Sequence, residues 1–281
     1  MPLTRVYLLT SLAMVAFAGN SLLCRLALDR TQIDPATFTL VRIVSGAMAL
    51  WLIVRLRPDG DPGHGSWPSA FFLFAYAAGF SFSYVSLPTA TGALLLFGAV
   101  QATMIGYGII TGERLGFWRA VGLLSAIVGL TFLLLPGLSA PPIQGAMLMS
   151  AAGISWGIYS LRGRGVEDPT CATAGNFLRA IPFTSVLTVI AIPWFVIDVR
   201  GLGYAVVSGA LTSGVGYSIW YTAIRRLNAT TAATVQLSVP VIAAVGGIAF
   251  LGEEITPRLI GSSLAILGGI ALVILSKQEV K

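Results

Sequence analysis

The feature that most constrains this chain is a series of long apolar segments. Ten stretches of about 20 mostly apolar residues follow one another, separated by short runs rich in Gly, Pro and charged residues. A helix needs about 20 such residues to cross ~30 Å of hydrocarbon. The pattern predicts an all-α integral membrane protein with ten transmembrane helices. The predicted spans are Thr4–Leu28, Pro35–Val54, Trp67–Ser86, Thr91–Thr111, Phe117–Leu135, Ile143–Leu161, Ala172–Ile197, Leu202–Ile224, Thr230–Leu251 and Arg258–Ser276.

The charge content excludes a soluble domain. Only 10% of the 281 residues are charged, and the mean hydropathy is +0.86. A soluble domain carries about 25% charged residues, so most of this surface must face lipid or other helices. The apolar pattern at the N-terminus runs on to Leu28, which favours a spanning helix over a signal peptide.

The distribution of Lys and Arg predicts an orientation in the membrane. If the N-terminus is cytoplasmic, eleven of the 17 Lys and Arg residues fall in inside segments and three in outside loops. Positive residues concentrate in cytoplasmic loops, so both termini are expected to be cytoplasmic. The net charge of +6 is therefore interpreted as an orientation signal in a bacterial inner membrane, and no nucleic-acid partner is expected.

The two halves of the chain resemble each other, which predicts an internal repeat. A shift of 140 positions places Gly112-Glu113 on Gly252-Glu253, and with a slightly different offset Arg42 aligns with Arg179. The predicted units are residues 1–139 and 140–281, with five spans each. Because five is odd, the second unit must enter the membrane inverted. Inverted repeats are typical of secondary transporters whose substrate site lies between the halves.

These features resemble the drug/metabolite transporter superfamily, in its ten-helix form built from two EamA-like units. The resemblance rests on the paired Gly-Glu turns, on Arg42 and on the polar starts of the fourth and ninth spans, Thr89–Ala93 and Asn228–Ala233. The overall sequence pattern is most similar to that of YddG-type exporters of aromatic amino acids. The resemblance implies a central cavity lined by spans one, three, four, six, eight and nine, with spans five and ten at the periphery.

The motifs of catalysis are missing from the sequence. The single His, His64, lies in a polar loop, and Lys is absent before Lys277, so neither a catalytic triad nor a Walker A lysine can be assembled. No catalytic residue, metal or cofactor is expected. The sequence favours a transporter over an integral-membrane enzyme such as a lipid-modifying transferase. Uptake or exchange of sugars or nucleotide sugars is a second transport hypothesis.

Polar and aromatic residues within the spans are the candidates for a substrate site. A polar side chain in hydrocarbon tends to face the bundle interior, where it either bonds a neighbouring helix or recognises a substrate. Aromatic residues recur on one face of spans three, six and eight, and such walls suit an amphipathic organic solute. The predicted lining comprises Asn20, Tyr76, Phe80, Tyr84, Gln101, Trp156, Tyr159, Tyr217, Trp220 and Gln236.

Two Arg residues and one Pro are expected to serve structure or gating. Arg42 and Arg179 occupy equivalent places in the two halves. Each could snorkel to the nearer interface, join a gate ion pair or bind a carboxylate. Pro240 removes a helical hydrogen bond and offers a bending point.

The small-residue stripe of Gly261, Ala265 and Gly269 could serve packing or a weak dimer, so a monomer or a weak homodimer is expected.

Together these observations predict a secondary exporter of amino acids, aromatic ones included, and of related small metabolites or drugs. Alternating access around a midplane site is expected from the repeat. All Asp and Glu residues and His64 fall in loops or at span ends. Because proton-coupled carriers usually hold such a group within the membrane, a uniporter driven by the substrate gradient is expected.

Overall fold

The computed structural model describes residues 3–57, 64–112, 116–135, 140–163, 166–224 and 235–275, and within these ranges the regular elements are all helices. The α-helices are α1 (Leu3–Arg30), α2 (Pro35–Arg55), α3 (Trp67–Tyr84), α4 (Thr89–Ile110), α5 (Phe117–Leu134), α6 (Ile143–Arg162), α7 (Pro169–Ile190), α8 (Val199–Val207), α9 (Gly216–Ile224), α11 (Ser238–Gly246) and α12 (Pro257–Leu275). A short 3-10 turn, η1 (Ile192–Trp194), follows α7, and two π-helical segments, η2 (Ser208–Val215) and η3 (Gly247–Leu251), follow α8 and α11.

Several helices have the length and composition of membrane spans. Helices α2, α4, α5 and α12 and most of α1 are apolar enough over 18 residues to cross a bilayer. The outer face of α5 exposes large apolar side chains such as Phe117, Leu124 and Val128, as expected where lipid replaces water. The expected all-α membrane class is therefore confirmed. The count of ten spans, the two repeat units and the cytoplasmic termini stay predictions.

Helix starts follow from short polar caps at the ends of the apolar segments. Asp34 precedes Pro35 and accepts hydrogen bonds from the Ala36 and Thr37 backbone N–H groups at 3.0 and 2.9 Å. Asp168 and Pro169 start α7 in the same way. An acidic cap followed by Pro satisfies free N–H groups and presets the helical backbone. These caps fix where the spans begin.

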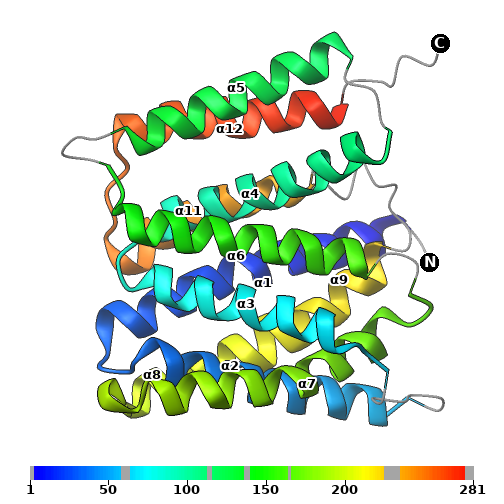
Figure 1. Ribbon diagram of the computed structural model, residues 1–281, viewed down its shortest axis with the longest axis vertical. Coiled ribbons are helices and arrows are strands. Elements are labelled where there is room, and N and C mark those ends of the chain that lie inside the picture. The colour runs from blue at the N-terminus through cyan, green and yellow to red at the C-terminus, as the bar shows by residue number, and fades with distance from the viewer. Residues whose placement is uncertain are drawn as a thin grey trace.

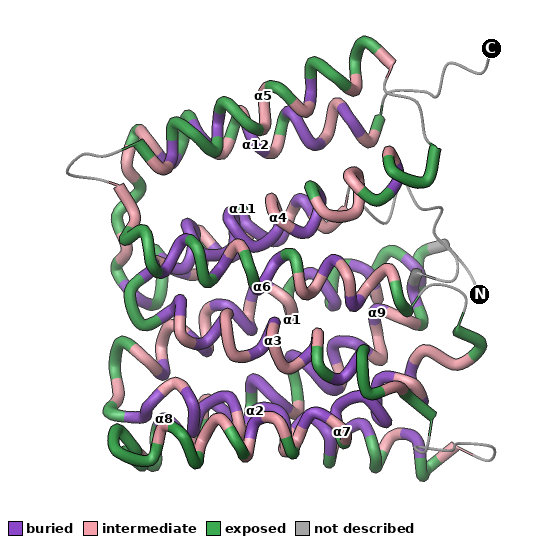
Figure 2. The backbone as a smooth tube through the Cα atoms, in the orientation of Figure 1, coloured by how far each residue is buried: buried purple, intermediate pink, exposed green. Residues whose placement is uncertain are grey.

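The helices run side by side as a bundle, and α1 begins at the same end at which α12 finishes (Figure 1). We call this the N-terminal end and the other the opposite end. Buried residues concentrate in the middle of the bundle, whereas α5 is largely exposed (Figure 2). Helices α5 and α12 pair at one edge, where the resemblance places spans five and ten.

Small residues join α5 to α12. A Cβ added to Gly122 would lie 2.5 Å from the carbonyl oxygen of Gly269, and one added to Gly129 would meet the Ala265 methyl at 2.7 Å. The Ser125 hydroxyl also donates to the Ala265 carbonyl at 3.1 Å. Small residues allow such close backbone approach. Ala265 and Gly269 of the predicted stripe therefore pack within the bundle and are not available as a dimer face.

The seventh span differs from its expected bounds. The sequence predicts Ala172–Ile197, but the helix runs from Pro169 to Ile190 and is followed by η1. The helix starts earlier because Asp168 caps it. It ends before Pro193, since Pro lacks an N–H and its ring clashes with the preceding turn. Pro193 thus lies beyond α7, while Pro182 is accommodated inside it.

The eighth and ninth spans are not uniform α-helices. Segment η2 interrupts the eighth span where Gly209 lies against the Arg42 carbonyl and the Ser45 hydroxyl of α2, too close for any Cβ. In the ninth span the helix is interrupted at Leu237, just before Pro240, and becomes π-helical at Gly247. π-segments inside α-helices mark places where packing overrides the regular hydrogen-bond pattern, often at functional sites.

The orientation can be checked by labelling single cysteines in a variant without Cys24 and Cys171. Arg200 lies at the start of α8 at the opposite end, and Gly60 falls outside the described residues. With both termini cytoplasmic, a membrane-impermeant thiol reagent added outside the cell should label Arg200→Cys and miss Gly60→Cys. If the reagent labels Gly60→Cys and misses Arg200→Cys, the protein has the opposite orientation in the membrane.

Candidate functional site

A small cavity lies in the middle of the bundle, among mostly buried side chains. Its volume is ≈ 20 Å³, room for about one water molecule. Side chains from both halves of the chain surround it. The lining is Phe17, Asn20, Ser21, Tyr76, Phe80, Leu96, Phe97, Trp156, Thr212 and Tyr217.

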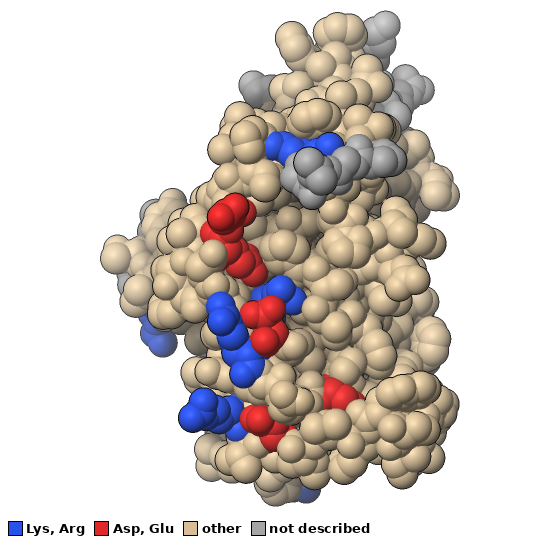
Figure 3. Space-filling view, turned by 90° about the vertical axis from the view of Figure 1, so that its left-hand side faces the viewer, with Lys and Arg blue, Asp and Glu red and all other residues tan. Residues whose placement is uncertain are grey.

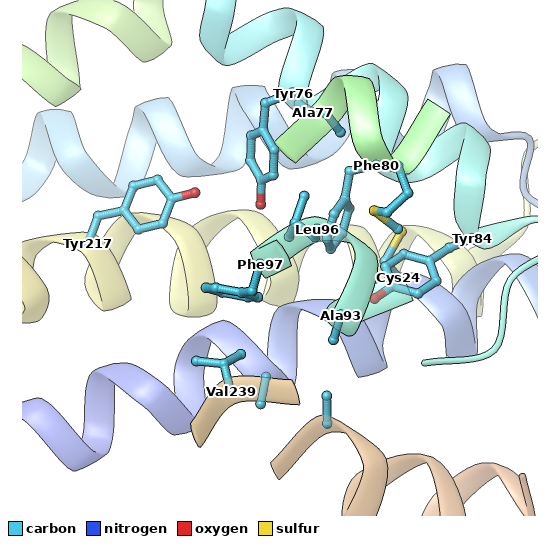
Figure 4. Packing of buried hydrophobic residues seen from close by; sticks show 14 of the residues in the cluster. Cys24, Tyr76, Ala77, Phe80, Tyr84, Ala93, Leu96, Phe97, Tyr217 and Val239 are labelled. Carbon is cyan, nitrogen blue, oxygen red and sulfur yellow. The ribbon is translucent and has the colours of Figure 1, made fainter. Parts of the chain in front are cut away.

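Aromatic rings form most of the cavity wall. The Trp156 ring lies 4.8 Å from the Tyr76 ring and 5.1 Å from the Tyr217 ring, centroid to centroid. Phe17 meets Tyr217 edge-on at 5.8 Å. Figure 4 shows the Tyr76 and Tyr217 hydroxyls pointing into the same space, above Phe97. Such tilted and edge-to-face pairs are favourable ring geometries, and they leave ring faces and edges for a solute.

Asn20 is the polar centre of the cavity wall. Its Nδ2 donates to the Tyr76 hydroxyl at 3.3 Å, and its Oδ1 accepts from the Ser208 hydroxyl at 2.6 Å and from the Thr212 hydroxyl at 3.4 Å. Ser208 and Thr212 belong to η2, so the π-segment of the eighth span supplies the partners of a first-span residue. A buried amide needs such partners to offset the cost of leaving water.

Arg42 lies behind the aromatic wall, and it does not snorkel. Only 1% of Arg42 is exposed. Its Nη2 donates to the Tyr76 hydroxyl at 3.0 Å and its Nε to the Ser213 hydroxyl at 3.4 Å. The guanidinium also lies over the rings of Tyr76 and Phe80, at 5.2 and 4.9 Å from their centroids. These interactions hold the side chain inside the bundle, which excludes the interfacial position that its distance from the helix end allowed.

Arg179, the counterpart of Arg42 in the predicted repeat, lies in a different environment. The Arg179 side chain is half-buried and donates to the carbonyl oxygens of Gly175 at 3.1 Å and His64 at 3.5 Å. It therefore ties α7 to the segment before α3 at the N-terminal end. The equivalence of the two Arg residues in sequence is not repeated in their surroundings.

The structure brings half of the predicted lining together at this cavity. Asn20, Tyr76, Phe80, Trp156 and Tyr217 line it. The other aromatic candidates adjoin these rings: Tyr84 packs on Phe80 at 4.8 Å, Tyr159 on Trp156 at 5.4 Å and Trp220 on Phe17 at 5.9 Å. Gln101 is buried in α4, Gln236 is half-buried and Pro240 is buried in α11, all outside the lining of the cavity.

Sequence reasoning missed the remaining half of the lining. Phe17, Leu96 and Phe97 are apolar residues in apolar spans, so their type carries no signal. Ser21 and Thr212 complete the missed half. Thr212 and its neighbour Ser213, which lies outside the lining, face Asn20 and Arg42, but Ser and Thr in membrane helices commonly bond their own backbone. Their shared position on η2, spaced by four and five residues from Ser208, is the one pattern that could have indicated them.

A larger pocket opens at the N-terminal end of the bundle. Its volume is ≈ 210 Å³, and Tyr159, Asn176 and Arg162 are among its lining residues. We call it the Tyr159 pocket. The Tyr159 ring also contacts Trp156, so these two rings separate the pocket from the central cavity.

Asp168 lies beside the Tyr159 pocket. Partial burial opposes ionisation of its carboxyl group, but hydrogen bonds from Cys171 and the nearby charge of Arg57 outweigh the effect of burial and place the Asp168 pKa below its usual value.

A second pocket opens at the opposite end. Its volume is ≈ 270 Å³, and its lining includes Pro88, Ala90 and Glu253. We call it the Glu253 pocket. Tyr84 packs on Phe80, which lines the central cavity, and donates its hydroxyl to the carbonyl of Thr89, whose neighbours Pro88 and Ala90 line the pocket.

Charged side chains gather on the opposite end, as Figure 3 shows. The Glu253 carboxylate accepts from the Thr89 backbone N–H at 2.8 and 2.9 Å and from its hydroxyl at 2.9 Å. Arg25 lies 3.8 Å from Glu253, forms an ion pair with Asp29 at 2.9 Å, and donates to the Tyr84 carbonyl at 2.9 Å. We call these residues the Arg25 network. It ties α1 to the start of α4 and to the segment between α11 and α12.

The site therefore consists of a small aromatic and polar centre with a larger pocket at each end of the bundle. On the side of the N-terminal end the Trp156 ring packs against Tyr159, and the Phe80 ring packs against Tyr84. This arrangement can hold a small amphipathic molecule in the centre only after side chains move, since the present space is about the size of a water molecule.

Comparison with known proteins points to a family. Residues 143–275 match the model of the EamA-like transporter family. A protein of Pseudomonas aeruginosa without an assigned function, PA1977, is 53% identical over 98% of this chain and 96% of its own length. The threonine/homoserine exporter RhtA of Escherichia coli is 33% identical over 56% of this chain, and the match spans about half of that exporter, 55% of its length.

The fold also matches a known crystal structure. That structure has a TM-score of 0.65, covers 94% of this chain and 98% of its own, and is 19% identical, which shows a shared fold alone. The family match and the relatives indicate a multi-pass membrane transporter of small metabolites rather than an enzyme. Residues 143–275 therefore match the EamA-like transporter family, which supports the resemblance to the drug/metabolite transporter superfamily.

Proposed function

We propose that this protein is a secondary exporter of amino acids, aromatic ones included, and of related small metabolites or drugs, and that it works by alternating access. The observation that carries the proposal is the aromatic cavity in the middle of the bundle, with a larger pocket at each end. The similarity to a threonine/homoserine exporter supports amino acids as the substrate class.

The chemistry of the cavity suits an aromatic amino acid. Ring faces of Trp156, Tyr217 and Phe17 offer stacking to an aromatic or apolar side chain, and Asn20 offers polar contacts to the amino-acid group. Apolar walls with a few placed polar groups are typical of sites for small organic molecules. The proposed substrate-binding residues are Asn20, Tyr76, Phe80, Tyr84, Gln101, Trp156, Tyr159, Tyr217, Trp220 and Gln236.

Alternating access requires one ring pair to part while the other stays closed. Opening between Trp156 and Tyr159 would join the cavity to the Tyr159 pocket, and opening between Phe80 and Tyr84 would join it to the Glu253 pocket. The π-segments and the helix interruption next to Pro240 are the places where spans eight and nine can bend. Arg42, Arg179 and Pro240 are proposed to shape these movements.

The proposed setting is a bacterial inner membrane with both termini cytoplasmic, so the Tyr159 pocket faces the cytoplasm and collects substrate for export. Residues 1–139 and 140–281 are proposed to act as inverted halves that rock against each other. A monomer or a weak homodimer suffices for this, because the central cavity is enclosed by one chain.

Energy coupling is proposed to be absent. The Asp and Glu residues that the structure describes lie at helix ends or between helices, and none lines the central cavity. A proton-coupled site must bind and release a proton as it changes sides, which Tyr and Arg do poorly at neutral pH. We expect a uniporter in which the substrate's own gradient drives net efflux.

A transport assay tests this function. Purified protein in liposomes should equilibrate phenylalanine, tryptophan, threonine or homoserine across the membrane without any ion gradient, faster than empty liposomes do. Transport of sugars but of no amino acid would contradict the proposed substrate class. Accumulation against a gradient that depends on an imposed pH difference would contradict the uniport mechanism and implicate Glu253, Glu254 or His64.

A further inference from the structure

We propose that Arg42 and Asn20 together bind the carboxylate of the substrate, and that the Tyr76 hydroxyl occupies the carboxylate's place when the site is empty. The inference deepens the proposed function, on which it rests, by naming the group of the substrate that is recognised and the residues that recognise it.

The charge of Arg42 is not neutralised by the chain. Among the residues that the structure describes, the carboxylates lie at helix ends or between helices, and those within ion-pair distance of an Arg pair with Arg25, Arg30 or Arg57. Arg42 is instead surrounded by hydroxyls and aromatic rings. A buried cation without a counter-ion is costly, so its retention in a membrane span indicates that an anion completes the site at some stage.

One nitrogen of the Arg42 guanidinium also lacks a hydrogen-bond partner. Its Nη1 is buried and has no hydrogen-bond partner, while Nη2 and Nε have hydroxyl partners. Arg presents a planar fork of donors that matches the two oxygens of a carboxylate. A buried donor left without a partner costs free energy, and an incoming carboxylate would recover it.

Two donors converge on a single neutral acceptor. The Tyr76 hydroxyl oxygen accepts from Arg42 Nη2 at 3.0 Å and from Asn20 Nδ2 at 3.3 Å. A carboxylate oxygen at that position would accept the same two hydrogen bonds with a full negative charge, which makes them stronger. The Tyr76 hydroxyl therefore acts as a stand-in acceptor.

The position of this acceptor relative to the cavity fits an amino acid. Asn20 and Tyr76 both line the cavity, so a solute in the cavity needs only to displace the Tyr76 hydroxyl to reach Arg42. The Trp156 ring contacts the rings of both Tyr76 and Tyr217, at 4.8 and 5.1 Å between centroids, so a substrate's ammonium or ring can stack beside this point. Arg42 would thus select anionic carboxylates, and the rings would select what the carboxylate is attached to.

The test compares ligands that differ only in the carboxylate. In liposomes, unlabelled phenylalanine should inhibit the transport of labelled phenylalanine at a concentration about tenfold lower than phenylalaninamide does. In Arg42→Gln the half-saturation concentration for phenylalanine should rise by about 10- to 100-fold, and the preference over the amide should disappear. Arg55→Gln is the matched control, since Arg55 lies on the same helix with an exposed side chain stacked on Trp51. The Arg55→Gln variant should prefer phenylalanine over phenylalaninamide to the same degree as the wild type does.

A second variant keeps the inference testable if Arg42→Gln fails to fold. Tyr76→Phe removes the stand-in acceptor and keeps the ring, so affinity for phenylalanine should increase several-fold while affinity for the amide should not. An undiminished preference for the carboxylate in folded Arg42→Gln, or weaker phenylalanine binding in Tyr76→Phe, would overturn the inference.

A binding measurement separates this inference from the proposed function. In detergent, 3-phenylpropionate should stabilise the wild-type protein against heat and 3-phenylpropanamide should not, and Arg42→Gln should abolish the difference. If no amino acid is transported but this pattern holds, the proposed function fails and the carboxylate site stands. If amino acids are transported and the pattern is absent, the carboxylate site fails alone.

Discussion

Replacing Trp156 with alanine should lower amino-acid transport at subsaturating substrate by about 30-fold. The Trp156 ring contacts the rings of Tyr76, Tyr159 and Tyr217, at 4.8, 5.4 and 5.1 Å between centroids. Each aromatic contact contributes about 0.5–1.5 kcal/mol, so losing the ring that a substrate would stack on removes about 2 kcal/mol of binding. The initial rate of labelled phenylalanine uptake into liposomes measures the effect.

Two further variants separate a binding role from a folding role. Trp156→Phe keeps a ring and should retain most of the rate. Trp118→Ala removes an equally large side chain that is 58% exposed on α5, and it should transport at the wild-type rate. If Trp156→Ala is folded and keeps both the rate and the substrate preference of the wild type, then the aromatic cavity is not the substrate site.

Replacing Glu253 with alanine should loosen the start of α4 and widen the Glu253 pocket at the opposite end of the bundle. The α4 helix starts after Pro88 without a cap from its own side chains, and Glu253 from the other half of the chain supplies the acceptor for the Thr89 N–H and hydroxyl. A carboxylate at a helix N-terminus contributes about 1–2 kcal/mol from capping and helix-dipole attraction. Its loss should raise the population that is open at this end by about tenfold.

The accessibility of Ala90 measures this opening. Ala90 lines the Glu253 pocket and is 8% exposed. In Glu253→Ala, a Cys at position 90 should react with a hydrophilic thiol reagent about tenfold faster than in the parent, and in Glu253→Gln by less, because the amide oxygen still accepts hydrogen bonds. Glu254→Ala changes a neighbouring exposed carboxylate and should leave the rate unchanged. Equal rates in all variants would show that Glu253 does not hold this end closed.

Much of the helical framework could be predicted from the sequence. The predicted start of the second span at Pro35 matches α2, and the apolar length of α4, α5 and α12 exceeds what a buried soluble helix requires. The start of α7 at Pro169 was missed, although the sequence Asp168-Pro169 marks it. The end of α7 follows from Pro193, whereas the π-segment η2 could not be predicted, because it depends on how Gly209 packs against α2. Tertiary contacts of that kind leave no periodic pattern in the sequence.

The candidate site was predictable in its polar and ring residues and hidden in its apolar ones. Asn20 and Arg42 are conspicuous because polar groups in a membrane span are costly. Phe17 and Phe97 line the same cavity, yet nothing in an apolar span distinguishes a lining Phe from a packing Phe. The role of Glu253 was also hidden: its repeat position was visible, but its contact with Thr89 joins residues 164 positions apart.

Counterflow in liposomes is the measurement that tests alternating access through a central site most directly. Liposomes loaded with unlabelled phenylalanine are diluted into a trace of labelled phenylalanine, with the same pH and salt on both sides. A carrier that exposes one site alternately to each side should concentrate the label transiently above its equilibrium level, and Trp156→Ala should suppress this overshoot. A monotonic approach to equilibrium would indicate a channel, and no entry without an imposed ion gradient would indicate a coupled pump; either result would contradict the account.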